Sequence, residues 1–461
     1  MIKRHMAVVF FMTAISSALS SYGQQNSGNT LGSLWPRVEN NYPGIHAKSA
    51  AVDAAKTHAR AVKTNRLPQV KVQAQNTYGT FEGAAGAFFP QAGFFNVSGS
   101  TATSTGSSVA ANTFGSATAE WEIFTFGRRQ KEYELAQAVA DKHINEQAVY
   151  LLDLKRSLAE RYITLLYNQA KLNWNNKNLQ RLHDIHRITS SLSKAGLRPA
   201  ADSLLALSSY NQSLADNDHF TGLKDAAMIK ITELYGSPDL DYTASLIRFS
   251  KPTSDAYGST KSITVSHPAL AVLQKQMDYY QLSSTVQKRA SLPAVRLLGG
   301  YAVRGTGIHP SGHVSDRWEA GFSNTTGNYL FGIGAVWNIT ALKTNSLKSR
   351  AFQKDAQSIQ QQFSAYEITM HADLQAASTK IAQQFQQISK TLTAMKQAEK
   401  AYEMYLARYK SGLIALSELL QIRQLLENAE NNHLEAAKQY WLLIAYEAVL
   451  TTDFNFLFNN L

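Results

Sequence analysis

The chain of 461 residues contains no cysteine at all. This absence excludes disulfide bonds, thiolate metal sites and a lipid anchor on an N-terminal cysteine. The sequence beyond the N-terminus also lacks a run of roughly 18 apolar residues, which is the length that a transmembrane helix needs. If the chain crosses a membrane, we therefore expect it to do so with strands.

Charge and motifs exclude several further classes of protein. The formal net charge is +11, from 45 Lys and Arg against 34 Asp and Glu. These basic residues are spread along helical segments and form no basic run interleaved with aromatics, so we expect no nucleic-acid partner. We find no nucleophile elbow, no metal-ligand cluster and no paired catalytic carboxylates. His183 and His186 lie one helical turn apart, but we interpret them as a solvated helix face. We therefore expect that the chain is not an enzyme and that it binds no cofactor and no metal.

The N-terminus has the features of an export signal. Lys3 and Arg4 precede an apolar run over residues 6–19, and the small residues Ser21 and Gly23 flank Tyr22. This pattern predicts a secretory signal peptide over residues 1–23, cut after Gly23. The alternative is a membrane anchor, for which the apolar run is short.

The remainder of the chain contains the same unit twice. Collinear matches occur at an offset of 225 residues and then of 216: Pro43 with Pro268, Pro68 with Pro293, Trp121 with Trp337, and the segment 194–197 with 410–413. We therefore predict a first repeat over residues 24–236 and a second over 263–452. A linker rich in Ser, Gly, Pro and Thr joins them at 237–262, and a C-terminal tail follows at 453–461.

Each unit has one plan. A short helix ends at a Leu-Pro pair, where Pro68 or Pro293 opens a strand. The expected strands cover about residues 68–80, 113–125, 293–304 and 328–340. The expected long helices cover about 127–193, 199–235, 341–410 and 414–450. Because no turn signal follows the last strand, we expect this strand to continue directly into the next helix, so that the sheet and the helices form one continuous layer.

The four strands alternate between an apolar and a polar or small face. Val70 and Val72 flank Lys71, for example, and Trp121 lies between Glu120 and Glu122. A barrel with lipid outside and water inside requires this pattern, and the alternative is a half-buried sheet in a soluble domain. Membrane barrels begin at about eight strands. Four strands per chain therefore imply that several chains share one barrel.

The long helices have coiled-coil spacing. Apolar residues recur at alternating three- and four-residue steps from Ile381 to Tyr409, and again from Leu419 to Leu443. A helix of about sixty residues is about 90 Å long at ~1.5 Å per residue. This length suits a duct across a wide aqueous gap better than a compact domain.

Taken together, the duplicated plan, the Leu-Pro pairs, the strand-to-helix passages at Trp121 and Trp337 and the two Gly-Leu turns resemble the TolC-type outer-membrane efflux family, from about Leu34 to Thr452. The resemblance implies an α+β membrane protein in the cell outer membrane. It implies a homotrimer with a shared 12-stranded transmembrane β-barrel, four strands per protomer, continuous with a long α-helical coiled-coil periplasmic tunnel. The implied function is a passive exit duct of a tripartite efflux system for drugs or other toxic compounds. The implied partners are a periplasmic adaptor, an inner-membrane transporter and outer-membrane lipid.

The two Gly-Leu turns carry the candidate sites. A glycine permits the positive φ of a helix end, and an acid in the first turn of the next helix is favoured by the helix dipole. The resemblance implies that this tip forms a periplasmic gate and contacts the adaptor. Threefold symmetry would then place three copies of the second acid, Glu418, in a ring of carboxylates. The gate candidates are Glu418, Tyr409, Asp202 and Gln421. The adaptor-contact candidates are Gly196, Leu197, Arg198, Gly412 and Leu413.

The tip departs from the family pattern at two positions. Gln421 occupies a position where some members carry a second acid, and Ile414 stands where the family has an arginine. Two other functions remain open on sequence alone. One is an exit duct for type I protein secretion, and the other is a non-conducting periplasmic coiled-coil scaffold.

Overall fold

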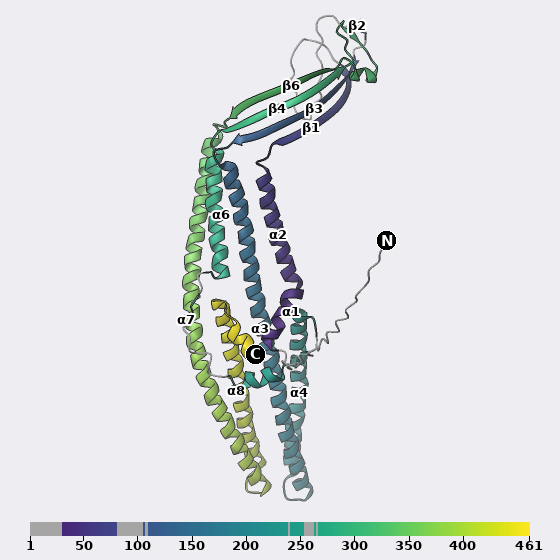
Figure 1. Ribbon diagram of the computed structural model, residues 1–461. Coiled ribbons are helices and arrows are strands. Elements are labelled where there is room, and N and C mark those ends of the chain that lie inside the picture. The colour runs from purple at the N-terminus through teal and green to yellow at the C-terminus, as the bar shows by residue number, and fades with distance from the viewer. Residues whose placement is uncertain (1–29, 81–104, 107–108, 238–239, 253–261, 264–265) are drawn as a thin grey trace, which may run out of the picture.

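The computed structural model describes residues 30–80, 105–106, 109–237, 240–252, 262–263 and 266–461. The expected signal peptide over residues 1–23 lies outside this part of the chain. The described residues form an elongated protomer with a β-sheet at one end and long helices that extend away from it (Figure 1).

The main sheet contains four antiparallel strands in the order β1-β3-β4-β6. The strands are β1 (Gln69–Thr80), β3 (Val109–Phe124), β4 (Ala294–Thr306) and β6 (Thr326–Val336). The short strands β2 (Thr105–Gly106) and β5 (His313–Val314) pair in parallel, and a 3-10 helix, η2 (Trp318–Phe322), lies near them. Strands β1 and β6 form the two edges of the main sheet.

The register places apolar residues of all four strands on one face. One row across the sheet is Val70, Ala119, Gly299 and Phe331, and the next is Val72, Ala117, Tyr301 and Tyr329. This face is open, since Val72 is 81% exposed and Tyr329 86%. The opposite face carries Lys71, Thr118 and Gly300 in one row. The alternation expected from the sequence is therefore continuous across the sheet.

Two very long helices extend along most of the helical part of the protomer. Helix α3 (Arg128–Lys194) has 67 residues and α7 (Ala341–Lys410) has 70, or about 100 Å each at 1.5 Å per residue. Near the sheet they pack with α2 (Pro43–Thr64) and α6 (Pro268–Ala290). Away from the sheet they pack with α4 (Ala200–Tyr235) and α8 (Leu416–Thr451).

The pairwise contacts order these helices side by side. The order near the sheet is α2-α3-α6-α7, and the order in the far half is α4-α3-α8-α7. The seam between α7 and α8 uses residues of the expected coiled-coil pattern, among them Ile381, Ile388 and Leu426, which are buried. Helix α7 thus forms one lateral edge of the protomer, and α2 and α4 form the other (Figure 1).

Three short helices pack at mid-height and correct two expectations. Helix α1 (Leu31–Asn41) contacts α9 (Asn455–Asn460), which occupies the expected tail, and α5 (Thr243–Ser250) lies within the expected linker. Phe249 is fully buried, and its carbonyl accepts a 3.1 Å hydrogen bond from Trp441 Nε1. The expected linker and tail therefore each contribute a helix to the core. Their few apolar residues pack against α3 and α8, and the composition of these segments does not predict such contacts.

The expectation that strand passes directly into helix is wrong in detail. Strand β6 ends at Val336, and four residues precede α7. There Asn338 Oδ1 accepts hydrogen bonds from the Thr340 hydroxyl (2.8 Å) and from Ala341 N (3.2 Å). The first N–H groups of a helix need such partners, so a short capping segment separates the two elements.

No helix in the described part of the chain combines the length and the apolar character needed to cross a membrane. Both long helices instead carry charged and amide side chains along their whole length.

Candidate functional site

The two helical hairpins end in the same backbone motif at the end of the protomer far from the sheet (Figure 1). Gly196 and Gly412 have φ of +69° and +78°. In the first turn, Gly196 N donates to Ser193 O and Leu197 N donates to Leu192 O. The second turn repeats the pair, with Leu413 N donating to Arg408 O. This is the Schellman motif, which favours glycine at the left-handed position.

Arg198 links the two tips. Its Nη2 donates a 2.9 Å hydrogen bond to the carbonyl of Ile414, and its guanidinium lies 5.5 Å from the ring centroid of Tyr409. Tyr409 is fully buried, and burial raises the pKa of its hydroxyl, with a further rise from Asp202 that Arg198 opposes. The structure thus brings Arg198, Tyr409 and Asp202 together. Arg198, expected as an adaptor contact, is used here within the protomer.

The other tip candidates are exposed. Leu197 and Leu413 are each 70% exposed at the two turns. Glu418 lies in the first turn of α8, where its Oε1 accepts a 3.4 Å hydrogen bond from Ala415 N. Gln421 lies exposed one turn further along α8. Within one protomer, Glu418 therefore has a helix-capping role and remains accessible to solvent.

A buried polar contact joins the two hairpins above the tips. Arg181 of α3 donates to both carboxylate oxygens of Glu430 of α8, at 2.8 and 2.7 Å. Trp174 Nε1 donates to the same carboxylate at 2.8 Å. Glu430 is only 8% exposed, so this contact is a specific, desolvated connection between the hairpins.

At the other end, two tryptophans fix the turns by which helices enter the sheet. Trp121 Nε1 donates to the carbonyl of Arg66 at 2.8 Å, and Trp337 Nε1 donates to that of Ser291 at 3.0 Å. Each acceptor lies two residues before the proline that precedes a strand, Pro68 or Pro293. The same hydrogen bond thus occurs once in each repeat.

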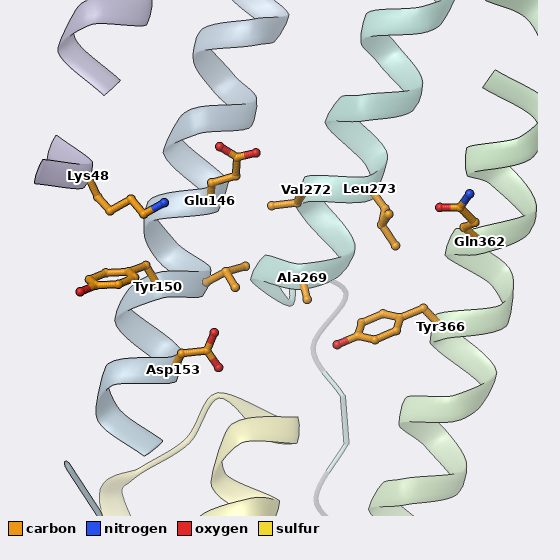
Figure 2. A pocket seen from close by; sticks show the side chains of 10 residues that line it. Lys48, Glu146, Tyr150, Asp153, Ala269, Val272, Leu273, Gln362 and Tyr366 are labelled. Atoms are coloured by element: carbon orange, nitrogen blue, oxygen red, sulfur yellow. The ribbon is translucent and has the colours of Figure 1, made fainter. Parts of the chain in front are cut away.

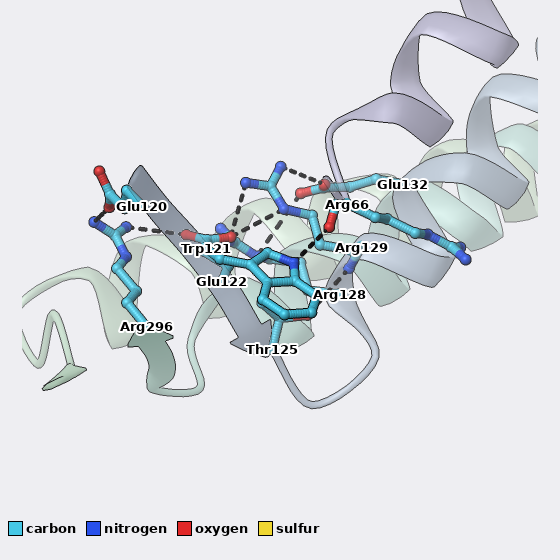
Figure 3. Close-up of polar contacts among 9 residues, drawn as sticks. All are labelled: Arg66, Glu120, Trp121, Glu122, Thr125, Arg128, Arg129, Glu132 and Arg296. Atoms are coloured by element: carbon cyan, nitrogen blue, oxygen red, sulfur yellow. Dashed lines mark hydrogen bonds and ion pairs between the residues drawn. The ribbon is translucent and has the colours of Figure 1, made fainter. Parts of the chain in front are cut away.

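A cluster of charges surrounds the first of these turns (Figure 3). Arg296 of β4 donates to Glu120 at 2.8 Å and to Glu122 at 3.0 Å. The second oxygen of Glu122 accepts from Arg128 at 3.0 Å and from Arg129 at 2.9 Å, both in the first turn of α3. Sequence analysis did not single out this cluster. The available signal was an alternating pair of acids followed, after one turn, by two arginines.

His267 joins two helices at mid-height. Its Nδ1 accepts a 3.3 Å hydrogen bond from Ala269 N in the first turn of α6, and its Nε2 donates to Val449 O near the end of α8 at 3.1 Å. The side chain is buried, and burial lowers its pKa, although the bond to Val449 opposes this effect. One neutral imidazole therefore caps α6 and connects it to α8.

Among the described residues, no group of three or more His, Cys, Asp or Glu is placed to hold a metal ion. The candidate residues lie in two groups, one at each end of an elongated molecule, and they do not converge on a single pocket.

Comparison with solved structures identifies the fold. CusC superposes with a TM-score of 0.74 at 15% identity, over 92% of each chain. Campylobacter jejuni CmeC, an outer membrane channel, gives 0.73 at 14% identity, over 98% of this chain and 94% of that one. Vibrio cholerae VceC, an outer membrane protein, gives 0.71 at 14% identity, over 91% and 96%. No curated protein matches the sequence. The fold is therefore that of outer-membrane channels.

The family follows from the sequence itself. Residues 34–237 and 260–448 match the outer membrane efflux protein family. The chain belongs to this family, and the two matched ranges cover most of both repeats.

Proposed function

We propose that three copies of this chain form a passive outer-membrane exit duct, with a shared twelve-stranded barrel and a helical tunnel in the periplasm. The observation that carries the proposal is that, in the described part of the chain, both the sheet and the helical layer end in complementary open edges. The family membership supports the same assignment.

The sheet edges are suited to pairing with further copies. Strand order β1-β3-β4-β6 is antiparallel throughout, so β1 and β6 run in opposite directions. Strand β6 of one copy can therefore pair antiparallel with β1 of the next. In lipid an open edge leaves backbone groups unpaired at several kcal/mol each, which favours closure into a ring. The exposed row of Val70 and Phe331 supports contact of one face with lipid.

The helical edges also carry unpartnered apolar residues. Ile229 on α4 is 68% exposed, and Ile368 and Met404 on α7 are 70% and 68% exposed. These helices lie on opposite lateral edges of the protomer. Contact between α7 of one copy and the α2–α4 edge of the next would bury these side chains and close a tunnel.

We further propose that the duct serves a tripartite efflux system for small molecules. Its periplasmic tips would meet an adaptor, and an inner-membrane transporter would supply the energy. The exposed Leu197 and Leu413 are the best adaptor-contact candidates, because Arg198 is engaged by Ile414 and Tyr409. A duct for type I protein secretion is the second candidate, since the inner-membrane partner selects the cargo.

The deciding experiment is electron microscopy of the detergent-extracted protein with its symmetry determined. We expect a threefold particle with a hollow helical stalk on the order of 100 Å long. The membrane fraction should release the protein with detergent and not with high salt. A monomer without a lumen, released by salt, would instead support a periplasmic scaffold.

The proposed carboxylate ring at the mouth predicts a change in ion selectivity. Threefold symmetry would place three Glu418 side chains around the axis, where they attract cations. We expect Glu418→Gln to lower the cation preference and change the conductance in planar bilayers. Glu39→Gln on α1, distant from the tips, is the matched control and should alter neither. Unchanged selectivity in Glu418→Gln would remove this role and leave the duct intact.

A further inference from the structure

A cavity of about 690 Å³, seen from close by in Figure 2, lies beside the start of α6, in the half of the helical layer near the sheet. All four helices of that half line it: α2 contributes Lys48, α3 Glu146 and Asp153, α6 Leu273, and α7 Tyr366. Its volume lies within the roughly 300–1,000 Å³ of small-molecule sites. The cavity belongs neither to the tips nor to the sheet junction.

The cavity lies on the concave face of the helical layer. Helices α2 and α7 are the two outer members of the order α2-α3-α6-α7, yet both line it, so the layer curves toward this side. On α3 the opposite face carries Lys155, whose Nζ lies 5.0 Å from the Trp35 ring of α1. At 3.6 residues per turn, Glu146 and Asp153 point about 160–180° away from Lys155. In a closed ring, the concave face is the wall of the lumen.

The lining combines an apolar floor with aromatic rings and carboxylates. Val149, Val272 and Leu273 provide apolar surface. Tyr150 and Tyr366 stand at opposite ends, as Figure 2 shows. The acidic and basic residues of the lining are two carboxylates, Glu146 and Asp153, and one ammonium group, Lys48.

Lys48 itself indicates the ligand chemistry. Its Nζ lies 5.7 Å from the ring centroid of Tyr150, so a cation of the chain already lies over an aromatic ring of this cavity. Asp153 is 57% exposed and has Arg156 at 3.6 Å, a weak surface pair that leaves the carboxylate accessible. Glu146 is shared with Lys142 at 3.5 Å and His143 at 3.0 Å. Asp153 is therefore the principal carboxylate available to an incoming cation.

We propose that this cavity is a weak binding site for amphipathic organic cations on the wall of the lumen, with Tyr366 and the apolar floor holding the apolar part and Asp153 and Glu146 the charge. The proposal rests on the proposed duct, because the duct makes the concave face a transit path. Lys48 competes with the ligand for the ring of Tyr150.

The test compares two probes of one shape and opposite charge, tetraphenylphosphonium and tetraphenylborate. Each is equilibrated by dialysis against the full-length protein in detergent, with a protein-free micelle blank. We expect saturable binding of tetraphenylphosphonium that weakens three- to tenfold in Glu146→Gln/Asp153→Asn and in Tyr366→Ala. Lys48→Gln should strengthen it. Tetraphenylborate should bind more weakly than the cation to the unmodified protein.

Glu160→Gln is the matched control. This exposed carboxylate lies on the same face of α3, about 10 Å beyond Asp153, outside the cavity lining. It should leave cation binding unchanged. Equal binding of both probes, or equal loss in Glu160→Gln and the double variant, would overturn the proposal. Bilayer conductance of the same preparations tests the duct separately, so a conducting protein without site-specific binding refutes the cavity alone.

Discussion

Single side chains at the ends of helices join elements that are far apart in the sequence. His267 connects α6 to α8 through one neutral imidazole. Tyr42 holds the matching position in the first repeat, directly before Pro43. Both helices thus begin at a proline and differ in the side chain before it. Only the second repeat carries an imidazole at this place.

His267 predicts that the protein loses stability in mild acid. Because the folded-state pKa is lowered from its ordinary 6.5, the unfolded chain binds more protons below that pH. The contribution of His267 is therefore complete above about pH 6.5 and falls as the pH decreases toward the folded-state pKa. One such group changes the unfolding free energy by at most about 1.4 kcal/mol per pH unit.

His267→Asn tests this directly by thermal melting in detergent between pH 5 and 8. Asparagine retains an acceptor for Ala269 N but loses the bond to Val449, at a cost of about 1 kcal/mol. We expect a lower melting temperature at pH 8 and a flatter pH dependence. His183→Asn, at an exposed position on α3, is the control. An unchanged slope in His267→Asn would assign the acid sensitivity to other groups, of which buried His433 is the first candidate.

At the scale of elements, periodicity and duplication predicted the four strands and the four long helices within a few residues. The strands are recognisable because Val70, Val72 and Ile333 alternate with polar or small neighbours. The short helices α5 and α9 could not be predicted in this way. Their few apolar residues, such as Phe249 and Leu457, show no periodic pattern. They are recognised as core residues only because the fold buries them against helices that are distant in the sequence.

The tip shows the same limit. The sequence was sufficient to predict Gly196, Gly412 and the two acids, because glycine is favoured after the end of a helix and an acid is favoured in the first turn of the next one. The use of Arg198 as a link to Ile414 depends on two turns 216 residues apart lying side by side. No local pattern contains that information.

The contact between the hairpins provides a prediction at this scale. Arg181→Met should lower stability strongly, by about 3–5 kcal/mol, because it leaves the carboxylate of Glu430 buried without its cationic partner and with Trp174 Nε1 as its remaining donor. The double variant Arg181→Met/Glu430→Met should recover part of the loss, since two apolar side chains replace the ion pair while Trp174 Nε1 loses its acceptor. Thermal melting of both variants measures the difference. A double variant that is no better than the single one would show that α3 and α8 require the charges themselves.

On the scale of the whole molecule, the protomer is incomplete at its borders. Among the described residues, β1 and β6 are each paired on one side only, and the helical layer ends in exposed Ile229 on one side and Ile368 on the other. The exposure of apolar side chains at both borders supports the proposed association of this chain with further copies of itself.

Charges at these borders should separate the copies without unfolding them. We expect Ile229→Glu and Ile368→Glu to shift the protein from trimer toward monomer, measured by light scattering after size exclusion in detergent. Both side chains are exposed in the protomer, so its helix content should remain unchanged by circular dichroism. Gln360→Glu, at an exposed position on α7, is the matched control. Intact trimers in both isoleucine variants would place the association elsewhere.

The two open strand edges also have a genetic consequence. If every ring needs β1 and β6 from each of three copies, one copy with a damaged edge interrupts the whole closure. A cell that expresses normal and edge-damaged chains equally, and mixes them at random, would then build roughly one intact ring in eight. A loss-of-pairing allele in β1 or β6 would therefore act dominantly, whereas an allele that prevents folding of the protomer would be recessive.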